Sequence, residues 1–190
     1  MHVKGLEAGM HEPRLRPIVG VGFMLGPCGA DHMFSVADAN SPMGIGGLRP
    51  LGILQPVPEN DWGPRRMAIT IAGHSRALIT DSLVTCGFTG VNSVDTLAAV
   101  TGWDVTASEL FKVGERILTA ARLFNVKQGL TDADDVLPER FYQPKTDGPL
   151  SNRPLNRETM AKAKGYYYAL MGWDKKGVPL PEKVAELYIE

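Results

Sequence analysis

The side chains best suited to redox or metal chemistry in this sequence are its cysteines and histidines, which are Cys28, Cys86, His2, His11, His32 and His74. A complete zinc or iron–sulfur site needs about four protein ligands, usually clustered in sequence. The two cysteines form no C-x-x-C pair, and the histidines show no H-x-x-x-H spacing. Two cysteines are also too few for a disulfide framework. The chain alone therefore cannot assemble a Cys₄ cluster, and a self-contained zinc hydrolase is excluded.

Two other stretches contain residue types that bind ligands in other proteins. The acidic turn Asp132-Ala133-Asp134-Asp135 lacks the central Gly and terminal Glu of an EF-hand. We interpret it as a solvated helix start. The run Gly20-x-Gly22-x-x-x-Gly26 has the wrong spacing for a dinucleotide loop, and no βαβ unit surrounds it. The sequence therefore favours neither calcium nor nucleotide binding.

The bulk composition is that of an ordinary soluble domain. The chain has 190 residues, of which 44% are hydrophobic and 22% charged, and its formal net charge is −1. Acids and bases are interspersed, so no basic face is available for nucleic acid. No window approaches the roughly 20 apolar residues that cross a bilayer, and the N-terminus lacks the apolar core of a secretory signal. We expect one domain over 1–190 in the cytoplasm, with no nucleic-acid or membrane partner.

The stretch 1–66 is dense in Gly and Pro, which disfavour regular helix. We therefore expect it to be an irregular N-terminal stretch. Within it, Arg16–Leu25 could be a short helix or a buried strand, because periodicity alone does not distinguish them.

The stretch 67–190 has helical patterns, beginning with a helix from Met67 to about Phe88 that Gly87 ends. This would put Asp81 and Cys86 in its last turns. A short helix follows over about 93–100.

Thr106-Ala107-Ser108-Glu109 is a capping box that begins the next helix. Behind it, apolar residues fall at helical spacing, namely Leu110, Val113, Ile117, Ala120, Ala121 and Phe124. Asn156 can cap another helix that Gly172 ends, and Pro181 begins a last helix through Leu187. The predicted fold class is mainly α.

Several ordered stretches together resemble one known family. They are Val3–Glu7, Met10–Arg14, Gly29–His32, Asp81–Phe88, Gly114–Ile117, Arg122–Asn125, Asp134–Phe141 and Tyr168–Pro179. In this order they resemble the C-terminal domain of the aldehyde:ferredoxin oxidoreductases, the tungstopterin enzymes that oxidise aldehydes to acids. The resemblance implies a helical domain of that type.

The resemblance also implies roles for four residues. Cys86 matches the family's cluster cysteine that is distant in sequence from the other three, and thiolates are the ligands of such clusters. Asp81 matches an aspartate that accepts hydrogen bonds from the pterin, and Thr85 a residue that contacts it through the backbone. His32 matches a histidine beside the tungsten, where it could bind the aldehyde oxygen or transfer a proton. Without the resemblance, Cys86 would be a small buried hydrophobe, His32 a loop residue, and Asp81 a partner of Arg76.

Three positions depart from the family pattern. Cys28 stands where Arg is usual, Phe34 where some members have a Lys that contacts the cofactor, and Val84 where Gly is common. Two cations beside an anionic cofactor are thus replaced.

The implied function is the C-terminal part of a tungsten or molybdenum pterin oxidoreductase that passes electrons through a [4Fe–4S] cluster to ferredoxin. Its substrate would be a small aldehyde. The pterin-binding region and the other three cysteines would come from a separate N-terminal portion. The alternative is an inactive truncated or split-gene domain that serves as a structural or interaction module. A simple thiol site using Cys28 and Cys86 is a third possibility.

Overall fold

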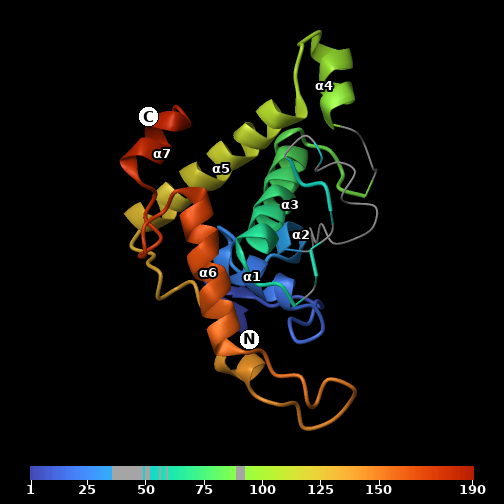
Figure 1. The fold of residues 1–190 in the computed structure, drawn as a ribbon, viewed down its shortest axis with the longest axis vertical. Coiled ribbons are helices and arrows are strands. Elements are labelled where there is room, and N and C mark those ends of the chain that lie inside the picture. The colour runs from blue at the N-terminus through green and yellow to red at the C-terminus, as the bar shows by residue number, and fades with distance from the viewer. Residues whose placement is uncertain (36–48, 50–51, 56, 59, 89–92) are drawn as a thin grey trace.

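The computed structural model describes residues 1–35, 49, 52–55, 57–58, 60–88 and 93–190, and it is mainly α, as predicted (Figure 1). Its helices are α1 (Pro17–Leu25), α2 (His32–Ser35), α3 (Pro64–Ser82), α4 (Ser93–Thr101), α5 (Ala107–Lys127), α6 (Arg157–Met171) and α7 (Pro181–Glu186). A 3₁₀ turn covers Glu139–Tyr142, and β1 (His2–Val3) pairs antiparallel with β2 (Leu6–Glu7). None of the helices in the described ranges is long and apolar enough to cross a membrane.

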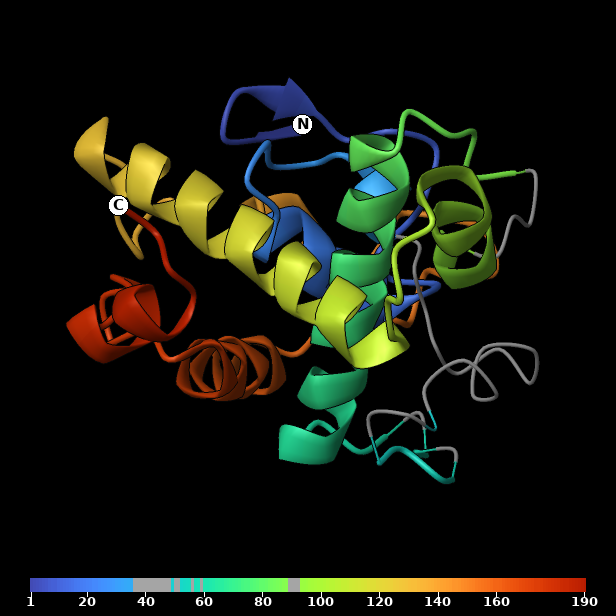
Figure 2. The same ribbon diagram turned by 90° about the horizontal axis from the view of Figure 1, so that it is seen from above.

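Helix α3 is the central element of the fold. It packs against both α5 and α6, while α1 packs against α2, α3 and α6. Figure 2 shows α5 crossing α3 and α2 lying beside the C-terminal half of α3. The main core cluster combines residues of α1, α3, α5 and α6 with Trp173 and Phe141.

Within the run Arg16–Leu25, for which the sequence left a short helix or a buried strand open, the structure has the helix α1 over Pro17–Leu25. Every residue of α1 after Pro17 is buried, and a helix that is apolar on all sides belongs in a core. Pro17 at the first position favours the helix, because its missing N–H is not needed there. A Cβ on Gly22 would lie 2.6 Å from the Cβ of Ser35, so this glycine allows α2 to pack closely.

Most of the predicted helix ends are confirmed. The side chain of Thr106 accepts from the N–H of Glu109, and the Glu109 carboxylate accepts from the N–H of Thr106. Asn156 accepts from the N–H of Thr159 at 2.8 Å, and Gly172 ends α6 in the left-handed conformation. On α5, however, Phe124 is 63% exposed, and the buried positions are Leu110, Gly114, Leu118, Thr119 and Arg122.

Helix α3 differs from the prediction at both ends. It begins at Pro64, and it ends at Ser82 rather than near Gly87. The chain turns at Val84, which has a positive φ of 54°. Cys86 therefore lies in a turn beyond the helix, whereas Asp81 lies in its last turn as expected.

A buried ionic cluster lies where the acidic turn was expected to be solvated. Asp135 is 0% exposed, and its carboxylate contacts Lys4 Nζ at 2.6 Å and Arg122 Nη1 at 2.7 Å. It also accepts a hydrogen bond from the Tyr168 hydroxyl. Burial lowers the pKa of Lys4, and the neighbouring carboxylate opposes this shift. Two cations that are distant in sequence thus draw the carboxylate into the interior.

The cluster connects segments from most of the chain. Lys4 Nζ donates to the carbonyls of Met24 and Gly26, at 2.5 and 2.9 Å, where α1 ends. Arg122 Nε on α5 donates to the carbonyl of Gly177 at 2.7 Å. The N-terminal hairpin, α1, α5, α6 and the C-terminal loop are therefore held together by these charged groups.

Replacing Asp135 should destabilise the fold strongly. We expect Asp135→Asn to lower the free energy of unfolding by about 3 kcal/mol, because it leaves two buried cations without a countercharge. Urea unfolding followed by circular dichroism measures the change. The exposed Asp147 gives a matched control, and Asp147→Asn should stay within about 0.5 kcal/mol of the unaltered chain. Equal effects of the two substitutions would contradict the role of the cluster.

A buried histidine lies in the core between α2 and α6. His74 on α3 is 0% exposed, and its Nδ1 is 2.9 Å from the hydroxyl of Tyr167. The ring of Phe34 lies against it, with the centroids 4.0 Å apart. Burial lowers the pKa of His74 to about 3, so the imidazole is neutral at neutral pH.

This histidine should make stability depend on pH. The unfolded His74 binds a proton near pH 6.5, whereas the folded state resists protonation down to about pH 3. The stability that the neutral, buried His74 contributes is fully present above about pH 6.5. It is lost as the pH falls toward 3. Between pH 7 and pH 5 we expect it to account for about 2 kcal/mol of lost stability. Urea unfolding at both pH values should show a correspondingly smaller loss for His74→Phe, and an unchanged loss would contradict this explanation.

Candidate functional site

The turn that carries Cys86 is fixed to the end of α3 by backbone hydrogen bonds. The N–H of Val84 donates to the carbonyl of Asp81 at 3.0 Å. The N–H and the hydroxyl of Thr85 both donate to the carbonyl of Thr80, at 3.2 and 3.1 Å. These bonds set the direction of Thr85 and Cys86 relative to the helix.

The three predicted residues in this segment are accessible to different degrees. Asp81 and Cys86 are exposed, and Thr85 is half-buried. An exposed thiol at an ordered turn is suited to ligate a metal centre at the protein surface. An exposed carboxylate can accept two N–H donors, as the predicted contact with a pterin requires.

His32 is the first residue of the short helix α2. The side chain of Asp31 accepts from the N–H of Met33 at 2.9 Å and so caps this helix. The His32 ring is half-buried and stacks on His11, with ring centroids 5.0 Å apart and an interplanar angle of 22°. His11 was noted in the sequence only as part of a motif, and its contact with His32 could not be found from spacing.

Helix α2 and the Cys86 turn are neighbours. A Cβ on Gly87 would lie 3.8 Å from Cε of Met33, which places the Met33 side chain against the turn. Asp81, Thr85 and Cys86 therefore lie together at the end of α3, and Met33, whose side chain reaches this turn, is the residue next to His32 in α2.

The residues that depart from the family pattern have different surroundings. Phe34 is 5% exposed and packs on His74, so it does not face a cofactor at the surface. Cys28 is exposed. Val84 is 93% exposed and has a positive φ, a conformation that β-branched residues disfavour.

The described residues do not form a complete metal site by themselves. Among the residues that the structure describes, no group of three or more His, Cys, Asp or Glu side chains could hold a metal ion. Cys86 fits the role of a single cluster ligand, because its thiol is exposed and its turn is ordered. The remaining ligands would have to come from outside this chain.

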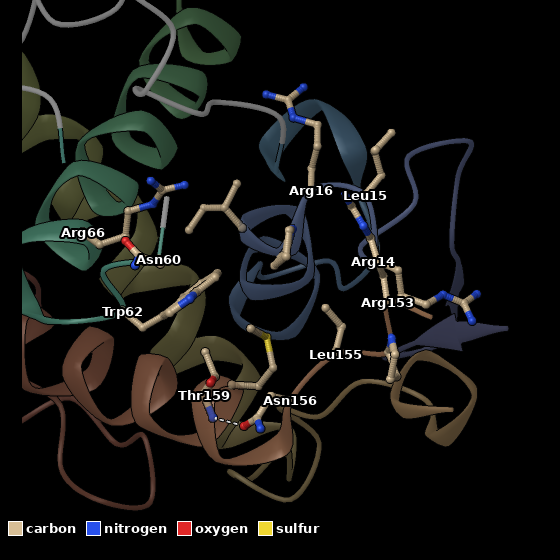
Figure 3. Close-up of a pocket in the computed structure, with 14 residues that line it drawn as sticks. Arg14, Leu15, Arg16, Asn60, Trp62, Arg66, Arg153, Leu155, Asn156 and Thr159 are labelled. Carbon is tan, nitrogen blue, oxygen red and sulfur yellow. Dashed lines mark hydrogen bonds between the residues drawn. The ribbon is translucent and has the colours of Figure 1, made fainter. Parts of the chain in front are cut away.

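A separate pocket of about 480 Å³ opens where α1, α3 and α6 begin (Figure 3). It is lined by Arg14, Arg16, Arg66 and Arg153 together with apolar side chains such as Trp62 and Leu155. Arg14 already pairs with Glu12, at 2.9 Å between Nε and Oε1. None of the predicted site residues lines this pocket, which lies at the opposite end of α3 from Cys86.

Several stretches that carry the family resemblance prove to be structural. Arg122 and Asp135 form the buried cluster, and Asn125 Nδ2 donates to the carbonyl of Pro27 at 2.9 Å. Arg116 Nε donates to the carbonyl of Leu187 at 2.6 Å. These residues position the site without belonging to it.

Relief of the left-handed strain at Val84 should stabilise the chain. We expect Val84→Gly to raise the free energy of unfolding by about 1 kcal/mol, since glycine adopts positive φ without a steric penalty. Val84 is almost fully exposed, so no packing is lost. The exposed Val100 in α4 is the control, and Val100→Gly should cost about 1 kcal/mol in urea unfolding. A loss of stability in both variants would show that Val84 is not strained in its left-handed conformation.

Comparisons with known proteins identify the family of this chain. The model of the family described as aldehyde ferredoxin oxidoreductase, domains 2 and 3, matches residues 1–189. The tungsten-containing aldehyde ferredoxin oxidoreductase of Pyrococcus furiosus is 33% identical over 196 residues, and that of Thermococcus kodakarensis is 32% identical. Both alignments cover the whole chain and 31% of the relative.

A more distant match is the aliphatic sulfonate oxidoreductase, WOR-like subunit, of Pyrococcus furiosus, which is 29% identical over 64% of this chain. The chain spans about a third of the length of the first relatives, with 31% covered. The family model covers nearly all 190 residues and agrees with the helical fold. The chain belongs to the aldehyde ferredoxin oxidoreductase family.

Proposed function

We propose that this chain is the C-terminal part of a tungsten or molybdenum pterin oxidoreductase that converts aldehydes to carboxylic acids. The observation that carries the proposal is the exposed Cys86 thiol, held in an ordered turn beside α2. Oxidation of an aldehyde with one water gives the acid, two protons and two electrons. The electrons would leave through a [4Fe–4S] cluster to ferredoxin.

In this proposal Cys86 supplies one thiolate to the cluster. The other three thiolates and the pterin-binding region belong to a portion of the enzyme outside these 190 residues. A [4Fe–4S] cluster accepts one electron at a time, which suits transfer to a ferredoxin. The two hydrogen bonds from Thr85 to the carbonyl of Thr80 would hold the neighbouring Cys86 thiolate in one direction.

His32 acts on the substrate in this proposal. A neutral imidazole has one donor and one acceptor nitrogen, so it can bind the aldehyde oxygen or take a proton from the attacking water. Asp81 accepts hydrogen bonds from the amino groups of the pterin, and Thr85 contacts it through the backbone. The pterin cofactor would supply the two-electron oxidation itself.

The surface around Cys86 supports the need for a partner portion. Val84 is 93% exposed and Phe88 85% exposed, and Met33 beside them is 42% exposed. Large apolar side chains grouped on a surface mark a region that another protein surface covers. The portion with the remaining cysteines is the proposed occupant. We place the complex in the cytoplasm, where exposed thiols such as Cys28 stay reduced.

A second function is a structural or interaction module without activity. It is favoured by the loss of a cation at Cys28 and by the strained Val84 in the Cys86 turn. The apolar surface would then still bind a partner, but no metal would follow. The two functions differ in whether Cys86 retains iron.

Substitution of Cys86 should distinguish the oxidoreductase from the inactive structural module. The chain is co-expressed with a family portion that carries the pterin-binding region and the other three cysteines, and the complex is purified without oxygen. We expect bound tungsten, four iron atoms per complex as in a [4Fe–4S] cluster, and aldehyde-dependent reduction of ferredoxin. Cys86→Ser should lose most of the iron and the ferredoxin reduction, because a hydroxyl is a poor ligand for iron in such clusters. Metal analysis and visible absorbance measure the loss.

Cys28 provides the matched control, since it is the other exposed cysteine. Cys28→Ser should keep the iron and the absorbance of the unaltered complex. If the complex forms but contains neither metal nor cluster, the structural module is the correct function. If Cys86→Ser retains all of its iron, Cys86 is not the ligand.

A further inference from the structure

The stacked pair of His11 and His32 joins two segments that are separate in sequence. His11 follows the N-terminal hairpin, and His32 begins α2. Their ring centroids lie 5.0 Å apart with an interplanar angle of 22°. The face of the His32 ring is therefore covered by a second aromatic ring.

The Nδ1 edge of the His32 ring occupies the space where a side chain at residue 9 would lie. A Cβ on Gly9 would lie 3.2 Å from Nδ1 of His32 and 3.7 Å from its Cγ. Gly9 has no positive φ, so the reason for glycine here is space rather than conformation. Nδ1 therefore faces the side of residue 9, and Nε2 lies on the other side of the ring.

Both sides of this contact are fixed to the rest of the fold. Beyond His11, Glu12 pairs with the buried Arg14, which donates to the carbonyls of Arg140 and Gln143 at 3.3 and 3.2 Å. On the other side, Asp31 caps α2, and the helix packs on the core through Phe34. The stack therefore joins two segments that cannot move freely.

We infer that His11 is a positioning residue that holds the His32 ring in its working orientation. This inference rests on the proposed function, in which His32 acts on the aldehyde. The stacked face and the Gly9 backbone restrict rotation of the ring about its side-chain bonds. Restricted rotation keeps Nε2 directed at one place, which lowers the entropy lost when the reacting atoms are aligned.

A metal site formed by the two histidines fits the geometry less well. Stacked rings present their faces to each other, so their nitrogens do not converge on one point. Within the described ranges, no third ligand completes a group with them. The stacked geometry therefore supports a role for His11 in orienting the His32 ring.

The test uses three variants of the 190-residue chain, alone and in the complex described above. His11→Ala removes the stacked ring, His11→Phe keeps a ring without nitrogens, and Gly9→Ala presses on Nδ1 of His32. In the chain alone, NMR of the His32 ring protons reports the stack through the ring-current shift. We expect this shift to disappear in His11→Ala and to remain in His11→Phe.

In the complex, kcat and KM for the aldehyde are measured together with the metal content. We expect His11→Ala and Gly9→Ala to lower kcat about tenfold with little change in KM, because misplaced groups slow the reaction more than they weaken binding. His11→Phe should restore most of the rate. His2→Ala, at the exposed position of β1, is the control and should match the unaltered complex in every measurement.

The outcomes separate this inference from the proposed function. If His32→Ala abolishes turnover but His11→Ala keeps full kcat, the positioning role of His11 is wrong and the role of His32 stands. If His32→Ala keeps full turnover, the proposed role of His32 is wrong, and the inference fails with it. If His11→Phe is as slow as His11→Ala, the stacked ring is not what positions His32.

Discussion

The buried carboxylate of Asp135 is the group on which the arrangement of the other elements depends. A carboxylate without exposure is costly unless cations and hydrogen bonds compensate for the lost water. Here Lys4 and Arg122 supply the charges, and the Tyr168 hydroxyl supplies a further hydrogen bond. Because Lys4 also binds the carbonyls at the end of α1, the hairpin, α1 and α5 take up one relative position. The need to compensate the buried Asp135 charge therefore constrains the fold together with the packing of the apolar core.

The cluster acts on the site through the segments that it fixes. The hairpin that contains Lys4 leads directly to His11, and the end of α1 leads to α2 and His32. The contact between the two histidines therefore depends on the same charged groups that hold the N-terminal segments in place. Cys86 is positioned differently, by hydrogen bonds at the end of α3. The framework is buried and charged, whereas the four proposed site residues are half-buried or exposed.

Local signals in the sequence were sufficient for several helix ends, and tertiary contacts explain the rest. The Thr106 capping box and the Asn156 cap were predictable because each involves residues three positions apart. The helix α1 could not be distinguished from a strand, since an apolar run fits either when both are buried. The end of α3 was predicted too far along the chain, because glycine is the usual residue to end a helix and Gly87 follows the apolar pattern of this segment. In the structure Val84 turns the chain at a steric cost. The four site residues were predicted from the family resemblance, but the stacked His11 depends on contacts that no spacing reveals.

The two lost cations have unequal consequences for a cofactor. The resemblance implies a lysine in some members at the position of Phe34, yet here this side chain is buried against His74. A lysine at that position would have to leave the core, because an unpaired ammonium is too costly there. The replacement of lysine by phenylalanine is therefore compensated by packing between α2 and α3. Cys28 is exposed, so core packing does not compensate in the same way for the arginine that the resemblance implies at this position. The difference in charge that a bound cofactor would meet is thus concentrated at Cys28.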